Sequence, residues 1–172
     1  QRIERLAPGF RVHTSAGILN ARCVLLAIGR RGTPRKLGVP GEEQAKVVYR
    51  VVDPEQYRGQ RVLVVGGGDS AVEAALACAA FAKVSLAYRG EAMNRIKRAN
   101  RERLAQATAS RHLNLLLRTE VREIGAREVL LETAGKPLRL ANDSVVVCAG
   151  GELPTAMLRE IGVRVETRHG SA

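Results

Sequence analysis

The sequence has 172 residues, a length that allows one domain with a buried core and part of a second. Hydrophobic residues make up 45% of it, which excludes a disordered chain, and no apolar run approaches the roughly 20 residues that span a bilayer. The net charge of +11 would suit an anionic partner, but aromatic residues are only 3% and no nucleic-acid motif accompanies the charge. We therefore expect a cytoplasmic protein without a membrane or nucleic-acid partner.

The first part of the chain predicts strands and then a linker. Residues 10–29 have the pattern of a strand, a turn at Gly17, a second strand and an apolar strand over residues 24–29 that ends in glycine. Prolines and glycines then mark a linker, at Pro34, Gly38, Pro40 and Gly41.

A β-α-β unit of roughly 30 residues follows the linker. Arg61–Val65 is a short β-branched run, which is typical of a buried parallel strand. Residues 70–81 are small and apolar without Pro or Gly and predict a helix packed closely on a sheet. Ser70 and Glu73 have the spacing of a capping box at the start of this helix. Residues 83–88 predict the second strand.

A helix and several further strands are expected after this unit. Residues 94–109 are charged and rich in alanine, which predicts a surface helix, and residues 113–117 predict a third strand. Residues 121–140 resemble a β-meander with glycine at its turns. Residues 144–148 predict a buried strand that again ends in glycines.

A weak internal repeat relates two parts of the chain. Residues 10–29 and 128–150 each contain a meander that leads to an apolar strand ending in glycine. The first copy lacks a glycine-rich turn of its own, because the chain begins too late to contain one. We therefore expect a fragment of a longer protein in which the intact domain runs from about residue 44 to residue 150.

The turn Gly66–Ala71 has the pattern G-x-G-x-x-A and joins the first strand of the β-α-β unit to its helix. Only glycine lets the backbone leave a strand tightly and approach a pyrophosphate without an obstructing Cβ. Gly66 supplies the turn, Gly68 the close approach, and Ala71 lets the helix lie against the strand. The helix amino terminus offers N–H groups and partial positive charge to the phosphates. The turn predicts a Rossmann-like, three-layer α/β domain that binds a dinucleotide.

The end of the second strand predicts which dinucleotide is bound. An NAD site carries an acidic residue there, about 20 residues after the glycines, to bond the ribose 2′-hydroxyl. This chain has Tyr88, Arg89 and Gly90 at that point. Arg89, with Arg95 from the next loop, supplies the forked cations that suit a 2′-phosphate, which favours NADPH. The alternative is that both arginines are solvated loop charges.

Three motifs in order resemble the thioredoxin-reductase-like pyridine nucleotide-disulphide oxidoreductases. Residues 27–42 are similar to the linker that leaves the flavin domain, residues 64–73 to the NADPH signature, and residues 150–154 to the returning linker. In that family NADPH reduces a bound FAD, which passes electrons to an acceptor that this stretch does not encode. The resemblance thus implies that this chain binds NADP(H) and that FAD is bound only by the full-length protein. It is also compatible with a parent protein that forms a homodimer.

The resemblance also implies roles for individual residues. The pyrophosphate would be held at Gly66, Gly67, Gly68, Asp69, Ser70 and Ala71. Arg89 and Arg95 would bind the 2′-phosphate, with the loop between them one residue longer than in the family. Ala149 and Gly150 would lie near the nicotinamide. No residue here is expected to be catalytic, and none has the spacing of a metal site.

One departure from the family changes the expected activity. Thioredoxin reductases carry a redox Cys-x-x-Cys before the first NADPH strand, and here Arg50 and Asp53 stand in its place. Neither side chain can exchange with a disulfide. The cysteines that the chain does have, Cys23, Cys78 and Cys148, are far apart and are expected to be buried core thiols. The parent is expected to resemble ferredoxin–NADP reductases or bacillithiol-disulfide-reductase-like proteins.

These observations define the expected organisation and function. Residues 1–43 are expected to be a remnant of the FAD domain with its linker, 44–150 the NADPH domain, and 151–172 the return to the FAD domain. The expected role is to position nicotinamide for hydride transfer to FAD in the full-length parent. Two alternatives remain, a non-catalytic NADP(H) sensor and a basic nucleic-acid-binding module.

Overall fold

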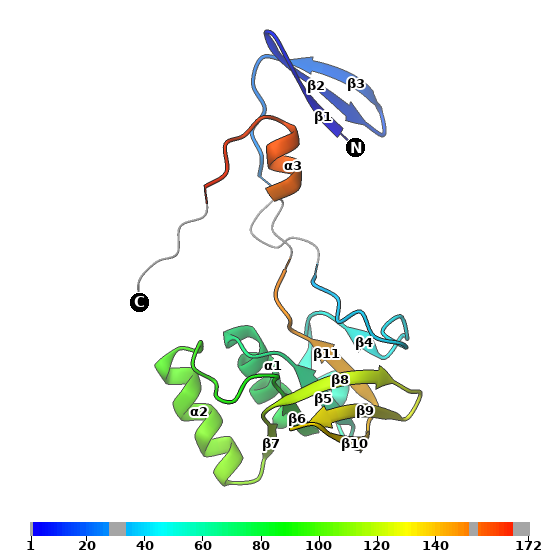
Figure 1. The fold of residues 1–172 in the computed structure, drawn as a ribbon, viewed down its shortest axis with the longest axis vertical. Coiled ribbons are helices and arrows are strands. Elements are labelled where there is room, and N and C mark those ends of the chain that lie inside the picture. The colour runs from blue at the N-terminus through cyan, green and yellow to red at the C-terminus, as the bar shows by residue number, and fades with distance from the viewer. Residues whose placement is uncertain (1, 28–33, 152–154, 167–172) are drawn as a thin grey trace. The chain divides into compact units, whose positions relative to one another are not determined.

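The computed structural model describes residues 2–27, 34–151 and 155–166. The chain forms two compact units, one from residues 34–150 and one from the two terminal segments (Figure 1). Parts of both predicted linker motifs, residues 28–33 and 152–154, lie outside the described residues. No helix in the described part of the chain is long and apolar enough to cross a membrane.

A five-stranded parallel sheet forms the centre of the larger unit. Its order is β4-β11-β5-β6-β7. The strands are β4 (Val47–Val48), β11 (Ser144–Val147), β5 (Arg61–Val65), β6 (Lys83–Ala87) and β7 (Leu113–Leu116). Val64 in β5 pairs with Leu86 on one side and Val146 on the other, and all three side chains are buried. The β-branched runs therefore form the expected buried strands, because a parallel sheet needs apolar residues on both faces.

Helices cover one face of this sheet. They are η1 (Pro54–Tyr57), α1 (Asp69–Ala79) and α2 (Arg98–Ala109). Val72 and Ala75 of α1 are fully buried against the sheet, so the small apolar residues give the predicted close packing. The helix α2 begins four residues later than predicted. Residues 94–97 form a loop instead, in which Ile96 is buried in the core.

An antiparallel sheet covers the other face, as the meander predicted. Its order is β10-β9-β8, with β8 (Thr119–Ile124), β9 (Glu128–Thr133) and β10 (Lys136–Ala141). Ile124 and Leu131 pack there against Leu63 and Val145 of the parallel sheet. Helices, parallel sheet and meander make three layers (Figure 1), which confirms the α/β fold class.

The segment before β4 also packs on the larger unit. The N–H of Ile124 donates to the carbonyl of Pro40 over 2.9 Å. The Glu42 carboxylate accepts from the N–H groups of Leu37 and Gly38, each over 2.7 Å. Burial alone would raise the pKa of Glu42, but these hydrogen bonds hold the pKa below its ordinary value. Residues 34–43 thus make their contacts within the larger unit, while the predicted domain boundary at residue 44 stays a prediction.

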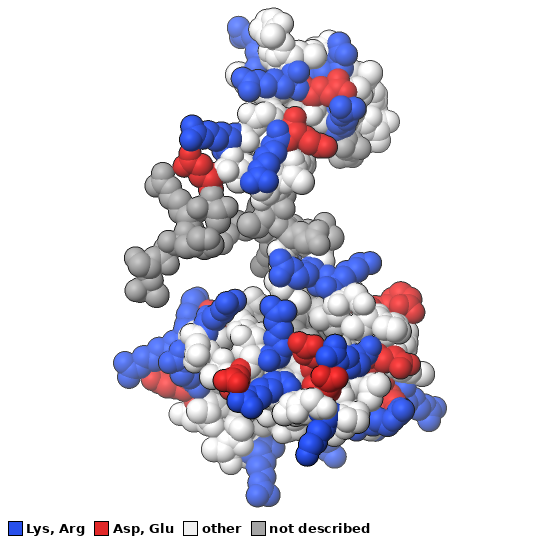
Figure 2. All heavy atoms as spheres, viewed as in Figure 1, with Lys and Arg blue, Asp and Glu red and all other residues white. Residues whose placement is uncertain are grey.

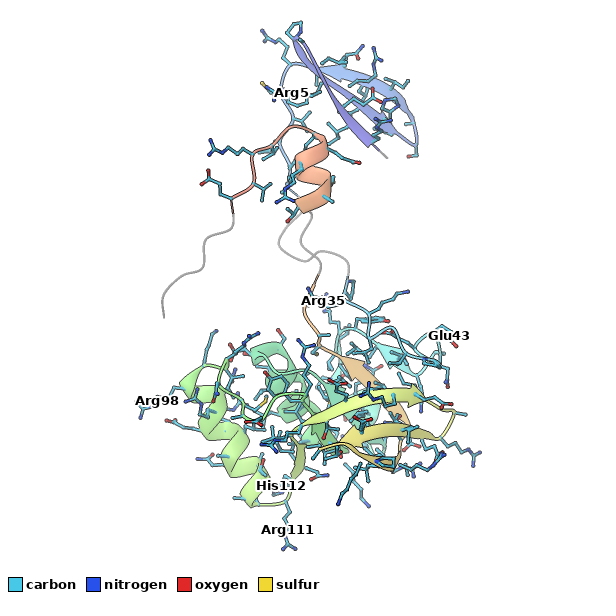
Figure 3. The ribbon with its side chains drawn as sticks, viewed as in Figure 1. Arg5, Arg35, Glu43, Arg98, Arg111 and His112 are labelled. Carbon is cyan, nitrogen blue, oxygen red and sulfur yellow. The ribbon has the colours of Figure 1, made fainter. Side chains whose placement is uncertain are left out.

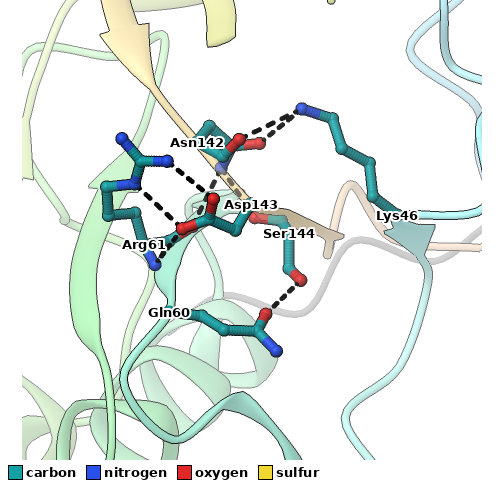
Figure 4. Close-up of polar contacts among 6 residues, drawn as sticks. All are labelled: Lys46, Gln60, Arg61, Asn142, Asp143 and Ser144. Atoms are coloured by element: carbon teal, nitrogen blue, oxygen red, sulfur yellow. Dashed lines mark hydrogen bonds and ion pairs between the residues drawn. The ribbon is translucent and has the colours of Figure 1, made fainter. Parts of the chain in front are cut away.

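A polar clamp joins the amino ends of the parallel strands (Figure 4). Asp143 accepts from the Arg61 backbone N–H over 2.9 Å and from the Arg61 guanidinium over 2.6 and 2.9 Å. Lys46 donates to the buried Asn142 over 2.9 Å, and Ser144 donates to Gln60 over 2.6 Å. These bonds hold β11 between β4 and β5 at the edge opposite to the carboxyl ends of the strands.

This clamp predicts a specific loss of stability in acid. The Arg61 side chain and backbone N–H hold the pKa of Asp143 well below its ordinary value. A lowered folded-state pKa stabilises the protein above the unfolded-state value of about 3.9, and this contribution is lost as the pH falls through the folded-state value. Asp143→Asn should therefore be less stable than the wild type at pH 7, and the difference should shrink at pH 3 in urea unfolding. Glu43→Gln, at an exposed position, should show no such pH-dependent difference.

The smaller unit differs from the sequence prediction at one point. Its strands β1 (Arg2–Leu6), β2 (Gly9–Thr14) and β3 (Gly17–Ala21) form an antiparallel sheet, and the helix α3 (Thr155–Glu160) belongs to the same unit. The predicted turn at Gly17 is confirmed, but residues 24–27 form no strand. A buried parallel strand needs neighbouring strands, and none of the described residues pairs with this segment, where Leu25 is 93% exposed.

Candidate dinucleotide site

Three glycines make the whole connection between β5 and α1. Gly66 has a φ of +154°, and a Cβ there would lie 2.5 Å from the carbonyl oxygen of Cys148 and 2.9 Å from the Cβ of Ala71. The N–H of Gly66 donates to the carbonyl of Ala87 over 3.0 Å. The turn therefore lies between the carboxyl ends of β6 and β11 and needs both a glycine and a small residue, as the sequence predicted.

The amino terminus of α1 is open to an anion. Gly68 is the N-cap, no side chain caps the helix, and no atom lies within 4 Å of a Cβ built on Gly68. The N–H groups of residues 67–70 donate to no acceptor in the described part of the chain. Unpaired N–H groups at a helix start carry partial positive charge and bind phosphates. The geometry suits a pyrophosphate, and the roles of Gly66 to Ala71 in binding one stay predictions.

Asp69 has a structural contact that the sequence did not predict. Its carboxylate accepts from the backbone N–H of Lys97 over 2.9 Å and from the amide of Asn100 over 2.7 Å. These bonds, with the charge of Lys97, lower the pKa of Asp69. Asp69 thus caps the start of α2, which explains why that helix begins later than its composition suggested.

The capping box expected for α1 does not form. Ser70 is the second residue of the helix rather than its N-cap and is exposed. Glu73 accepts from Asn100 over 3.0 Å instead of turning back to the helix start. The expectation was wrong because the turn places Gly68, not Ser70, at the position where the helix begins.

The Asp69 contact predicts a local effect. Asp69→Ala should remove the cap of α2 and leave the side-chain amide of Asn100 with Glu73 as its one acceptor among the described residues. Amide hydrogen exchange in the first turn of α2 should then accelerate several-fold, while exchange in β5 stays unchanged. Ser70→Ala, one residue away and exposed, should leave exchange in α2 unaltered; equal acceleration in both variants would contradict the assignment.

The two arginines predicted to bind the 2′-phosphate are exposed. Arg89 follows β6 by two residues, and Arg95 lies in the loop before α2. Neither side chain forms a hydrogen bond or ion pair within the described residues. Met93 and Ile96 are buried and fix the loop to the core. Figure 2 shows basic side chains around the start of α2, so an anion approaching the phosphate turn meets positive charge.

Ala149 and Gly150 follow β11 at the same edge of the sheet. Gly150 has a φ of +88°, and its carbonyl accepts from the backbone N–H of Arg35, the residue labelled in Figure 3, over 3.0 Å. Ala149 packs partly against the core beneath the meander. These residues lie next to the turn, since β11 is the neighbour of β5, but their predicted place near the nicotinamide is not tested by any contact.

The two residues at the positions of the missing dithiol, Arg50 and Asp53, are an exposed side chain and a helix cap. Arg50 is exposed, and Asp53 caps η1 by accepting from the N–H of Glu55 over 2.9 Å. The Asp-Pro-Glu order is a known helix-start signal and could have predicted this cap. Cys78 is buried and Cys148 partly buried, as expected, but the expectation was wrong for Cys23, which is exposed.

Neither of the inner thiols is activated. Burial, and to a lesser extent the nearby Cys148, raises the pKa of Cys78 to about 11. Burial also raises the pKa of Cys148. A raised pKa keeps the thiol protonated at neutral pH, and the protonated form is a poor nucleophile. No group of His, Cys, Asp and Glu among the described residues could hold a metal ion.

One open groove of the larger unit lies at the edge of the sheet opposite to the phosphate turn. Its volume is about 610 Å³, and Lys83, His112 and Asn142 are among its lining residues. His112 and Arg111 lie at the far end of α2 (Figure 3), beyond the amino ends of the strands. Dinucleotides bind at the carboxyl ends of parallel strands, so the candidate site is the phosphate turn and not this groove.

Nearly the whole chain matches one family of proteins. The profile described as pyridine nucleotide-disulphide oxidoreductase covers residues 1–170. The chain belongs to this family. The sequence resemblance is thereby confirmed.

Individual members of the family are also similar to this chain in sequence. The chain is 32% identical to a ferredoxin–NADP reductase of Ignicoccus hospitalis over 148 residues, which are 84% of this chain and 48% of that protein. It is 38% identical to a thioredoxin reductase of Mycolicibacterium smegmatis over 109 residues, 60% of this chain and 33% of that protein. The chain thus spans about half the length, or less, of these pyridine nucleotide-disulphide oxidoreductases.

Solved structures share the fold. Bacillithiol disulfide reductase from Staphylococcus aureus matches with a TM-score of 0.89 at 24% identity, over 98% of this chain and 53% of that chain. A thioredoxin reductase from Streptococcus pyogenes matches with a TM-score of 0.72 at 31% identity, over 94% of this chain and 55% of that one. The chain therefore shares the fold of about half of each of these reductase chains.

Proposed function

We propose that this chain is the NADPH-binding part of a flavin-dependent oxidoreductase. The observation that supports it is the open helix start at Gly68, which lies at the carboxyl ends of the strands with Arg89 exposed after β6. A site for NADH would carry a carboxylate where Tyr88 and Arg89 stand. The forked guanidinium of Arg89 suits a 2′-phosphate, and Arg95 is proposed to join it.

The proposed work of these residues is to bind and orient the cofactor. The N–H groups of residues 67–70 would bind the pyrophosphate, with Gly68 leaving room for it. Ala149 and Gly150 would lie beside the nicotinamide. The flavin of the parent supplies the redox chemistry, so this chain needs no acid or base of its own.

The proposed parent is a reductase that uses FAD and lacks a dithiol in this region. Members of the family use FAD and NAD(P)H, and we extend this to the full-length protein. Arg50 and Asp53 occupy the dithiol positions of thioredoxin reductases, and the raised thiol pKa values of Cys78 and Cys148 offer no replacement. A ferredoxin or a low-molecular-weight disulfide is therefore the class of acceptor we propose, in the cytoplasm.

Titration of the chain with NADPH and NADH tests the proposal. NADPH should bind at least about tenfold more tightly, the effect of about one charge-assisted hydrogen bond. High salt should weaken NADPH binding more, because the 2′-phosphate adds charge to the contact. Equal affinity for the two dinucleotides would refute the 2′-phosphate assignment, and no binding of either would refute the proposed function.

Gly68→Ala should block binding without unfolding the chain. A Cβ at Gly68 meets no atom of the protein, and its φ of −110° suits any residue. The N-cap change from glycine to alanine costs only about 1 kcal/mol or less. The methyl group would, however, fill the space into which a pyrophosphate must come. We expect at least about tenfold weaker NADPH binding with a nearly unchanged unfolding midpoint, measured by titration and by thermal unfolding.

A further inference from the structure

The ring of Tyr88 lies between two glycines of the candidate site. A Cβ built on Gly67 would lie 2.0 Å from Cε2 and 2.3 Å from Cδ2 of the ring. A Cβ built on Gly90 would lie 2.5 Å from Cε1 and 2.9 Å from the hydroxyl oxygen. Opposite edges of the ring therefore face the two glycines. Gly67 is a glycine because the ring leaves no room for a side chain, a reason different from that of Gly66 or Gly68.

The backbone that carries this ring is held on both sides. The N–H of Tyr88 donates to the carbonyl of Leu116 over 2.9 Å, and its carbonyl accepts from the N–H of Thr119 over 3.0 Å. The carbonyl of Gly90 accepts from the N–H of Arg118 over 3.0 Å. The ring can therefore leave its place only by rotation about its own side-chain bonds.

The phosphate turn is anchored to the same strand. Gly66 donates to Ala87, the residue immediately before Tyr88. One edge of the ring thus contacts the turn, and the other contacts Gly90, the residue after Arg89. The ring fills the space between the two parts of the site that would bind the pyrophosphate and the 2′-phosphate.

We propose that Tyr88 is a positioning residue whose ring sets the separation between the phosphate turn and Arg89. The inference rests on the proposed function, because the separation matters only if one ligand contacts both parts. The shortest contacts with both glycines come from ring carbons, and the hydroxyl has no hydrogen-bond partner in the described part of the chain. The ring, rather than the hydroxyl, is therefore expected to carry the effect.

A double-mutant cycle in the ligand-free chain tests the packing. Gly67→Ala should lower the urea midpoint of the wild-type chain, because its methyl group meets the ring. In a Tyr88→Ala background the same change should have little effect, since the ring is gone. Gly68→Ala is the matched control and should show no coupling to Tyr88, because its Cβ position is open. Additive effects of Gly67→Ala and Tyr88→Ala on the urea midpoint would contradict the contact between the Tyr88 ring and Gly67.

Titration of the same variants tests the role in binding. Tyr88→Phe keeps the ring and should bind NADPH within about twofold of the wild type, whereas Tyr88→Ala should bind it about tenfold more weakly. NADH should be affected less, because it has no 2′-phosphate to align with Arg89. Wild-type affinity in Tyr88→Ala, or an equal loss in Tyr88→Phe, would overturn the proposal.

The two experiments separate this inference from the proposed function. A wild-type chain that binds neither dinucleotide refutes the function, whatever the stability cycle shows. A wild-type chain that binds NADPH, while Tyr88→Ala binds it equally well, refutes the role of Tyr88 and leaves the function standing.

Discussion

Replacing Arg89 with alanine should weaken NADPH binding by about 10- to 100-fold, the range for a charge-assisted hydrogen bond of about 1.5–3 kcal/mol. NADH binding should change little, because it has no 2′-phosphate to meet the guanidinium. The structure makes Arg89 a suitable target, since its side chain is exposed and bonds to no described residue. Its loss should therefore leave the fold intact. Isothermal titration with both dinucleotides gives the ratio directly.

Two further variants separate the forked geometry of Arg89 from its charge. Arg89→Lys keeps the charge but loses the planar fork, so its affinity for NADPH should lie between those of the wild type and Arg89→Ala. Lys83→Ala removes the same charge from the other end of β6, where the side chain is also exposed. An equal loss of NADPH affinity in Lys83→Ala would show that net charge, and not a specific contact, explains the result.

Gly41→Ala should destabilise the larger unit by on the order of 3 kcal/mol or more, which would lower the melting temperature by roughly 10 °C. Gly41 has a φ of +80°, and a Cβ there would lie 1.9 Å from the carbonyl oxygen of Ile124. That backbone cannot yield easily, because Ile124 is buried and its N–H is bonded to Pro40. The loop would have to separate from β8.

Gly59→Ala is the matched control for this prediction. Gly59 has a φ of +74°, close to that of Gly41, but no atom lies within 4 Å of its Cβ position. Its substitution should lower the free energy of unfolding only by the cost of placing alanine in the left-handed conformation, about 1–2 kcal/mol. The difference in melting temperature between the two variants, measured by thermal unfolding, therefore gives the effect of the clash alone. A similar melting temperature for the two would mean that the Gly41 loop does not pack on β8 in solution.

Much of the larger unit could be predicted from sequence because the signals are local. β-branched runs at Arg61–Val65 and Ser144–Val147 form central strands, since only a buried sheet accommodates them. Gly66 in the phosphate turn has a φ of +154°, a backbone that residues other than glycine rarely adopt. The same reasoning failed for residues 24–27, because an apolar run becomes a strand only where partner strands exist to pair with it.

Binding roles were harder to derive than the fold. Asp69 lies in the phosphate turn by sequence, yet its carboxylate is bonded to Lys97 and Asn100, which are 28 and 31 residues away. No spacing rule predicts such a contact, because it depends on how the loop before α2 folds back. The contact adds helix capping by the Asp69 side chain, while the role of this residue in binding the pyrophosphate stays a prediction.

The sequence by itself determined the three-layer fold, the phosphate turn and the basic residue in place of an acid after β6. Each was predicted from short runs of consecutive residues, because the conformations open to those runs are limited. The tertiary structure alone decided that Tyr88 lies between Gly67 and Gly90 and that Asp69 caps α2. The contacts of Tyr88 with Gly67 and of Asp69 with α2 join segments that are distant along the chain, and their geometry follows from the packing of whole elements rather than from any local preference.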